Sequence, residues 1–135
     1  MITSGTPVDW RDLQEQVAGI LRECGFTAEV EKTLATVRGN TSVDIYAEET
    51  VKGRKYVILS ECKHWTAAVP QQVIHAFRTT VADVGANVGY VIASNGFQSG
   101  AFAASELTNL ELVTWEQFQA AFEESSGAGR LFNAR

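Results

Sequence analysis

Residues 55–65 read KYVILSECKHW, and this stretch decides the fold that the sequence predicts. Aromatic and β-branched residues open it, which is typical of a strand. Because side chains alternate between the faces of a strand, Ser60 and Cys62 share one face, whereas Glu61 and Lys63 share the other. The sequence therefore places an acid beside a base at the end of a strand that begins as apolar core.

Two further strands are expected before this one. FTAEVEKTLATV predicts a strand over about 26–36, and SVDIYAEE predicts another that begins near Ser42. Gly39-Asn40 and Lys52-Gly53 mark the turns that join the three strands. Short turns favour antiparallel pairing, so the first half of the sheet is predicted to be a meander.

The middle strand of this meander carries a third charged residue of interest, Asp44. Strict alternation places Val43, Ile45 and Ala47 on one face, with Asp44 and Tyr46 on the other. We expect the first group to face a hydrophobic core.

A helix is predicted at the N-terminal end. Thr6 is expected to cap it, Pro7 to take its first position, and Gly25 to end it. Its apolar face recurs at helical spacing through Leu13, Val17, Ile20, Leu21 and Cys24.

Helices and strands alternate after the meander. Pro70 opens a second helix that Gly85 ends, and VGYVIAS predicts a strand that is buried on both faces. SGAFAASEL predicts a short helix, LELV a brief strand, and Thr114 with Gln117 a capping box for a last helix. The predicted order is α-β-β-β-α-β-α-β-α, an α/β fold with a mixed sheet flanked by helices. We expect one domain over residues 1–124 and a flexible tail over 125–135.

Composition limits the functional classes. The chain has 135 residues, 45% of them hydrophobic and 20% charged, as in globular domains. No apolar run reaches the roughly 18 to 20 residues that span a bilayer, and the first residues do not resemble a secretory signal. These features predict a cytoplasmic protein without a membrane partner. The net charge of −5 counts against a broad nucleic-acid surface.

Three charged side chains are expected to converge. Counting outward from a turn near residue 53 places Asp44 opposite Cys62, and therefore beside Glu61 and Lys63. Carboxylate oxygens suit Mg²⁺, which activates water and stabilises charge on phosphorus, while an ammonium group orients that water. This set is suited to phosphodiester hydrolysis. The alternative is a solvated cross-strand ion pair with no chemistry.

The ordered motifs VDIYAEE and YVILSECKHW resemble the D…ExK signature of the PD-(D/E)xK nuclease superfamily. The similarity is greatest to the Mrr-like restriction endonucleases. It extends through LRECGF, VPQQVIHAF, GANVGYVIASNGFQSGAFAAS and LELVTWEQF, and so covers residues 8–122. The resemblance implies a restriction-endonuclease-like fold and a Mg²⁺-dependent DNA endonuclease, with Mn²⁺ as a substitute.

The resemblance also implies roles for individual residues. Asp44 and Glu61 match the metal-binding carboxylates, Lys63 matches the catalytic lysine, and the backbone carbonyl of Cys62 completes the metal shell. Relatives often carry a glutamate in the first helix, where this chain has Gln14 with Glu15 beside it. They also often carry a glutamine in the helix after the ExK motif.

For that second position this chain offers Gln72 and His75 as accessory candidates. Candidates for contact with DNA are Lys32, Arg38, Trp65 and Arg78.

Two alternatives remain beside the restriction-type endonuclease. One is a structure-selective nuclease of the Holliday-junction type, and the other is a catalytically idle nuclease fold that binds DNA or protein. One site per domain makes a homodimer a candidate for cutting both strands. The sequence shows no recognition domain, so we expect specificity either to come from a separate partner or to be slight.

Overall fold

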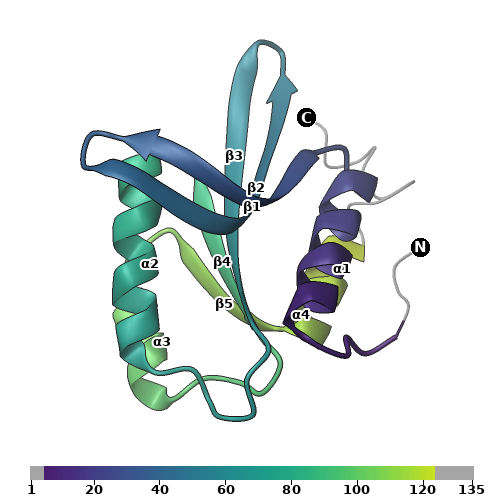
Figure 1. The fold of residues 1–135 in the computed structure, drawn as a ribbon, viewed down its shortest axis with the longest axis vertical. Coiled ribbons are helices and arrows are strands. Elements are labelled where there is room, and N and C mark those ends of the chain that lie inside the picture. The colour runs from purple at the N-terminus through teal and green to yellow at the C-terminus, as the bar shows by residue number, and fades with distance from the viewer. Residues whose placement is uncertain (1–4, 124–135) are drawn as a thin grey trace.

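The computed structural model describes residues 5–123 and places a five-stranded sheet between two layers of helices (Figure 1). In chain order the elements are α1 (Trp10–Glu23), β1 (Thr27–Thr36), β2 (Gly39–Val51), β3 (Arg54–Lys63), α2 (Gln71–Val84), β4 (Val88–Ala93), α3 (Ser99–Ser105), β5 (Leu110–Thr114) and α4 (Trp115–Glu123). This order and the mixed α/β sheet confirm the fold predicted from the sequence. The predicted tail over 125–135 lies outside the described residues.

The sheet is antiparallel in its first half and parallel in its second. The strands are ordered β1-β2-β3-β4-β5; β1, β2 and β3 pair antiparallel, and β4 and β5 extend the sheet in parallel. The β2–β3 turn contains Lys52 and Gly53, with φ of 53° and 79°. Two positive φ values in a two-residue loop are those of a type I′ turn, which suits the twist of a hairpin.

Helix α1 begins later than the sequence predicts. Its first residue is Trp10, and Asp9 is the N-cap in place of Thr6. The Asp9 carboxylate accepts a 2.8 Å hydrogen bond from the backbone nitrogen of Asp12. An aspartate at this position satisfies a free helix N–H group at least as well as a threonine does, so Pro7 remains outside the helix.

The turn positions and strand register of the meander differ from the prediction by one or two residues. Thr36 pairs with Gly39, so the first turn consists of the two residues between them and Gly39 already belongs to β2. Around the second turn Ile45 pairs with Ser60. This register differs by one residue from the expected one, and beyond the last pair Asp44 meets β3 through a hydrogen bond from the backbone nitrogen of Cys62.

Two hydrophobic cores cover the two faces of the sheet. The core under α1 and α4 contains Leu13, Val17, Leu21, Ile45, Ala47, Ile58, Cys62, Ile92 and Phe118. The core under α2 and α3 contains Val43, Val57, Leu59, Ile74, Phe77, Val91, Ala101 and Leu110. Strand β3 contributes to both in alternation, as its sequence predicts. None of the helices described is long and apolar enough to cross a membrane.

Strand β2 changes direction at Asp44. Val43 packs in the core under α2, whereas Ile45 packs in the core under α1, so the prediction that both share a face is wrong. The pairing of β1 with β2 skips Glu31 and Asp44, and Glu31 has a φ of 55°. A strand that is interrupted here no longer follows strict alternation. The interruption lies at a residue of the candidate site.

Candidate active site

Strands β2 and β3 bring three charged side chains to one end of the antiparallel pair. Oδ2 of Asp44 accepts a 2.8 Å hydrogen bond from the backbone nitrogen of Cys62. Nζ of Lys63 lies 3.3 Å from Oε2 of Glu61, and these two side chains are only 20% and 24% exposed. The acid and the base noted in the sequence are therefore in contact, and they are largely shielded from water.

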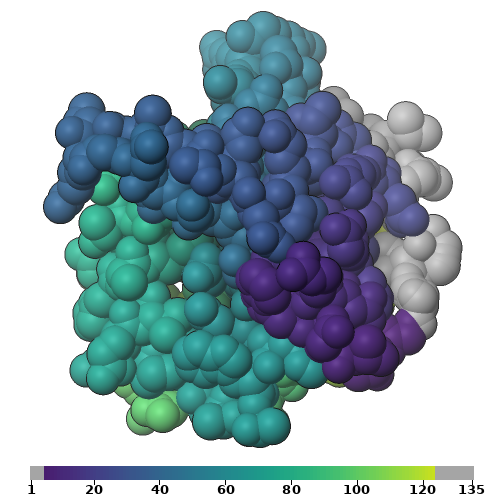
Figure 2. Space-filling model, in the orientation of Figure 1, coloured from purple at the N-terminus to yellow at the C-terminus, as the bar shows by residue number. Residues whose placement is uncertain are grey.

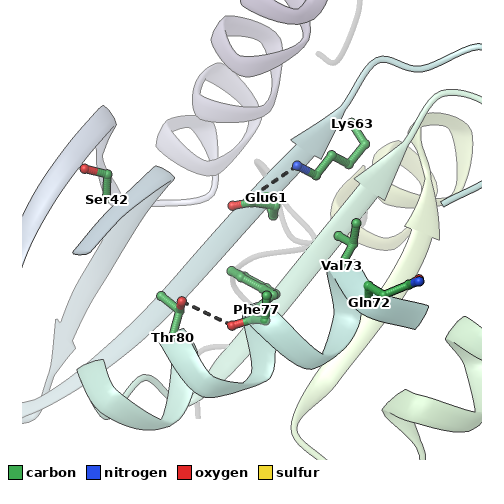
Figure 3. A pocket seen from close by; sticks show the side chains of 8 residues that line it. Ser42, Glu61, Lys63, Gln72, Val73, Phe77 and Thr80 are labelled. Atoms are coloured by element: carbon green, nitrogen blue, oxygen red, sulfur yellow. Dashed lines mark hydrogen bonds and ion pairs between the residues drawn. The ribbon is translucent and has the colours of Figure 1, made fainter. Parts of the chain in front are cut away.

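A cleft opens between β3 and α2 beside this pair (Figure 3). It encloses about 290 Å³ and is lined by Ser42, Glu61, Lys63, Gln72, Val73, Ala76, Phe77 and Thr80. Figure 3 shows Glu61 and Lys63 on the strand, with Phe77 and Val73 on the facing helix. Because a water molecule occupies about 30 Å³ in the liquid, the cleft has room for several water molecules or a small polar group.

Helix α1 places two polar side chains next to Asp44. Gln14 is fully buried, and neither its amide nitrogen nor its amide oxygen makes a hydrogen bond of normal geometry. Trp10 lies one turn earlier on the same helix face. Both side chains are close enough to Asp44 to favour its ionised form. A buried amide without a partner is unfavourable, and a bound ion or its water shell would satisfy it.

The two carboxylates are held where ionisation is unfavourable. Burial raises the pKa of Asp44, opposed by the hydrogen bond from Cys62 and the charge of Lys63. Burial and then the charge of Asp44 raise the pKa of Glu61, and Lys63 again opposes the rise. One ammonium group does not fully compensate two buried carboxylates. These residues therefore fit a site that takes up a cation.

Cys62 contributes its backbone and not its thiol. The thiol is buried in the core under α1, and this burial raises its pKa well above the usual range. The carbonyl of Lys63 accepts a 3.0 Å hydrogen bond from Ser94 on the side of β4. Since successive residues of a strand turn their peptide groups to opposite edges, the Cys62 carbonyl faces β2 and Asp44.

Of the accessory candidates, Gln14 and Gln72 lie at the site and the others lie elsewhere. Gln14 is buried beside Asp44, and Gln72 lines the cleft. Glu15 and His75 are exposed and do not line it. Within residues 5–123 no three histidine, cysteine, aspartate or glutamate side chains gather as a metal-binding group.

The candidates for DNA contact differ in their surroundings. Lys32 pairs with Glu29 at 2.9 Å, and Arg38 pairs with Asp83 at 3.1 Å. Trp65 lies next to the site, with Nζ of Lys63 5.1 Å from the centre of its ring.

Arg78 is exposed on α2. Of the four candidates, the structure thus brings one, Trp65, into contact with Lys63.

Two residues near the site were not singled out from the sequence. Ser42 lines the cleft, and its signal is the spacing of two residues from Asp44 along the strand. Trp10 is near Asp44, and its signal is the spacing of four residues from Gln14 along a helix. Both signals become informative only once Asp44 and Gln14 have been chosen as site residues.

Comparison with known proteins places the chain in a family. Residues 6–122 match the family model Mrr_cat, which is described as a restriction endonuclease. No curated protein matches the sequence at a significant level.

Three solved structures are similar to this chain in part. A protein of unknown function, AF1548, is 17% identical, with a TM-score of 0.63 over 76% of this chain. The restriction endonuclease MspJI, solved with a 27-mer oligonucleotide, is 20% identical, with a TM-score of 0.47 over 90% of this chain. The DNA modification-dependent restriction endonuclease AspBHI is 11% identical, with a TM-score of 0.48 over 93%. This chain spans 56%, 29% and 43% of those three chains, respectively.

Proposed function

Because the chain belongs to the Mrr_cat restriction endonuclease family, we propose that it is a Mg²⁺-dependent endonuclease that hydrolyses phosphodiester bonds in DNA. The observation that carries this proposal is the convergence of Asp44, Glu61 and Lys63 at one end of β2 and β3. The proposal includes a cytoplasmic location, where DNA is accessible, and DNA as the partner.

Asp44, Glu61 and the carbonyl of Cys62 are the groups that would hold the metal. They are hard oxygen donors, which Mg²⁺ prefers, and Mn²⁺ accepts the same donors. Gln14 offers its unpartnered amide to the water shell. When bound, a divalent cation supplies Lewis acidity and lowers the pKa of coordinated water.

Lys63 is the residue assigned to the reacting atoms. Its ammonium group is held by Glu61 and faces the cleft, where it donates hydrogen bonds to the attacking water or to a phosphate oxygen. The water oxygen forms the new bond to phosphorus, and one ester oxygen leaves as an alcohol. Lys63 stabilises the negative charge that develops on the phosphate oxygens during this exchange.

A cleavage panel tests the proposal. Purified protein is incubated with duplex, single-stranded and four-way-junction DNA and with RNA, in Mg²⁺, in Mn²⁺ and in EDTA. We expect DNA cleavage with either metal and none in EDTA. Lys63→Ala should lower the rate by about 100-fold or more, since removal of one preorganised donor has effects of this order.

Lys52→Ala is the matched control, because Lys52 is exposed in the β2–β3 turn and remote from the cleft. It should cleave at the wild-type rate. Absence of cleavage on every substrate, or cleavage that survives Lys63→Ala, would contradict the proposal. Preference for the four-way junction over linear duplex would indicate the junction-selective alternative. Binding of DNA without cleavage would indicate the idle fold.

A further inference from the structure

Two of the three tryptophans stand at the proposed site with part of their surface exposed. Trp10 and Trp65 are each 39% exposed, whereas Trp115 is buried in the core at 4%. The ring of Trp65 is in contact with the ammonium group of Lys63, and the indole of Trp10 is close to Asp44. Both exposed indoles therefore adjoin groups that we assign to catalysis.

The chain segments that carry these two indoles lie against each other. A ring nitrogen of His64, the neighbour of Trp65, is 3.2 Å from the carbonyl oxygen of Pro7, which precedes α1. Figure 2 shows the dark purple start of α1 at the surface beside teal residues. The segment before α1 and the segment after β3 therefore meet near the end of β3 where Glu61 and Lys63 lie.

Several basic side chains on the described surface are already paired with carboxylates. Four of the basic side chains pair with carboxylates at 4 Å or less: Arg11 with Glu31, Lys32 with Glu29, Arg38 with Asp83 and Lys55 with Glu48. The net charge is −5. Affinity for duplex DNA comes largely from cations that replace counterions along the phosphates. Another source of binding energy is needed at this site.

Aromatic stacking is such a source, and it selects a particular kind of DNA. In a duplex the faces of the bases are covered by their neighbours, and only their edges are exposed in the grooves. A base can stack on a tryptophan only when it is unpaired or has been extruded from the helix. A base on Trp65 would belong to a nucleotide at or next to the scissile phosphate, because the ring adjoins Lys63.

We infer that Trp10 and Trp65 form a stacking site for unpaired bases, and that the preferred substrate is DNA with unpaired nucleotides at the position of cleavage. This inference rests on the proposed endonuclease function and narrows its substrate class. Single strands, flaps and bubbles share the required chemistry. A continuous, fully paired duplex lacks it.

Fluorescence anisotropy in EDTA measures the inferred site without catalysis. The three probes are a labelled single strand, the same sequence as a duplex, and that duplex with an internal unpaired segment. Wild-type protein should bind the first and third probes more tightly than the duplex. Trp65→Leu should weaken binding to those two by roughly 5- to 100-fold, the range that loss of one base-stacking contact gives. It should leave duplex binding unchanged.

Two further variants separate stacking from folding. Trp65→Phe retains an aromatic face and should keep most of the preference for unpaired DNA. Phe102→Leu removes another exposed aromatic ring, on α3 and outside the cleft lining, and should bind all three probes as the wild type does. Thermal unfolding of each variant checks that the fold is retained.

Binding of duplex as tight as that of unpaired DNA, or no binding to any probe, would overturn the inference. An equal loss on all probes in Trp65→Leu would also overturn it. Cleavage assays in Mg²⁺ distinguish this failure from failure of the proposed function. If the protein cuts duplex and bubble at the same rate, it is an endonuclease without the inferred preference. If it cuts neither but prefers unpaired DNA in the anisotropy assay, the stacking site stands and the catalytic proposal fails.

Discussion

At the scale of single residues, the candidate site holds two carboxylates whose ionisation burial disfavours when no cation is bound. Burial raises the pKa of Asp44 and of Glu61, and the charge of Asp44 raises the pKa of Glu61 further. Gln14 adds a buried amide near Asp44 that makes no hydrogen bond of normal geometry. Natural sites often retain such unfavourable groups where binding requires them.

Glu61→Gln should therefore not destabilise the metal-free protein near neutral pH, and should raise its Tm slightly. Glutamine resembles the protonated acid, which burial favours in the folded state. The folded pKa lies above the unfolded one, so the stabilising effect of the proton is present at low pH. It is lost as pH rises through the interval between the two pKa values. The Tm difference between variant and wild type, measured in EDTA, should grow across that interval.

Divalent metal should make the wild type more stable than the Glu61→Gln variant, the reverse of their order in EDTA. Wild-type Tm should rise with added Mg²⁺ or Mn²⁺ by mass action, and the Glu61→Gln variant should respond less. Glu15→Gln, an exposed change on α1, is the control and should respond as the wild type does. A Glu61→Gln protein with a lower Tm at neutral pH in EDTA would contradict the view that this carboxylate opposes folding.

The predictability of these residues depends on whether their signal is local. Period-two alternation was sufficient to place Glu61 and Lys63 on one face, because β3 is regular over its length. Gln14 differs, since a helical face reveals its neighbours but not what a strand brings against it. The interaction of Gln14 with Asp44 depends on how α1 packs on the sheet, which no local pattern encodes.

At the scale of elements, local signals predicted the order of helices and strands and some of their ends. The capping box is present: Thr114 and Gln117 exchange hydrogen bonds of 2.9 and 3.1 Å at the start of α4. The interruption between Glu31 and Asp44 was not predicted, because neither residue is a glycine or a proline that would announce it. It arises where β2 leaves one core for the other, and so follows from packing.

Two glycines allow a matched test of how the elements pack. A Cβ atom on Gly89 of β4 would lie 2.6 Å from Val81 and 2.8 Å from Phe77, both on α2. Gly89→Ala should therefore destabilise the protein by about 1–3 kcal/mol, as overpacking does. It should also disturb the cleft that Phe77 lines. Chemical denaturation measures the first effect and the cleavage rate measures the second.

Gly19→Ala is the matched substitution in the same experiment, and it should change stability in the opposite direction. Gly19 lies inside α1, and nothing is within 4 Å of the position of an added Cβ atom. Alanine there should stabilise the helix by about 0.5–1 kcal/mol, because glycine loses more backbone freedom on folding. Equal effects of the two substitutions would show that β4 and α2 are not packed as closely as the distances indicate.

At the scale of the whole molecule, the described residues hold a single set of Asp44, Glu61 and Lys63. The full sequence carries a net charge of −5. One set of catalytic groups can hydrolyse one phosphodiester bond in each encounter. Weak attraction to phosphates shortens each encounter with a duplex. Scission of both strands therefore requires either a second copy of the chain or a second encounter.

Plasmid cleavage at low protein concentration should thus yield nicked circles first and linear DNA only later.

Negatively supercoiled plasmid should be nicked faster than relaxed closed circles of the same sequence, because supercoiling opens short unpaired segments that can stack on Trp10 and Trp65. Gel electrophoresis over a time course, at several protein concentrations, measures both rates. Linear DNA that forms without a nicked intermediate, with a rate rising as the square of protein concentration, would instead indicate a dimer that cuts both strands together. Relaxed and supercoiled circles cut at equal rates would argue against recognition of unpaired bases, because the two differ in topology and not in sequence or charge.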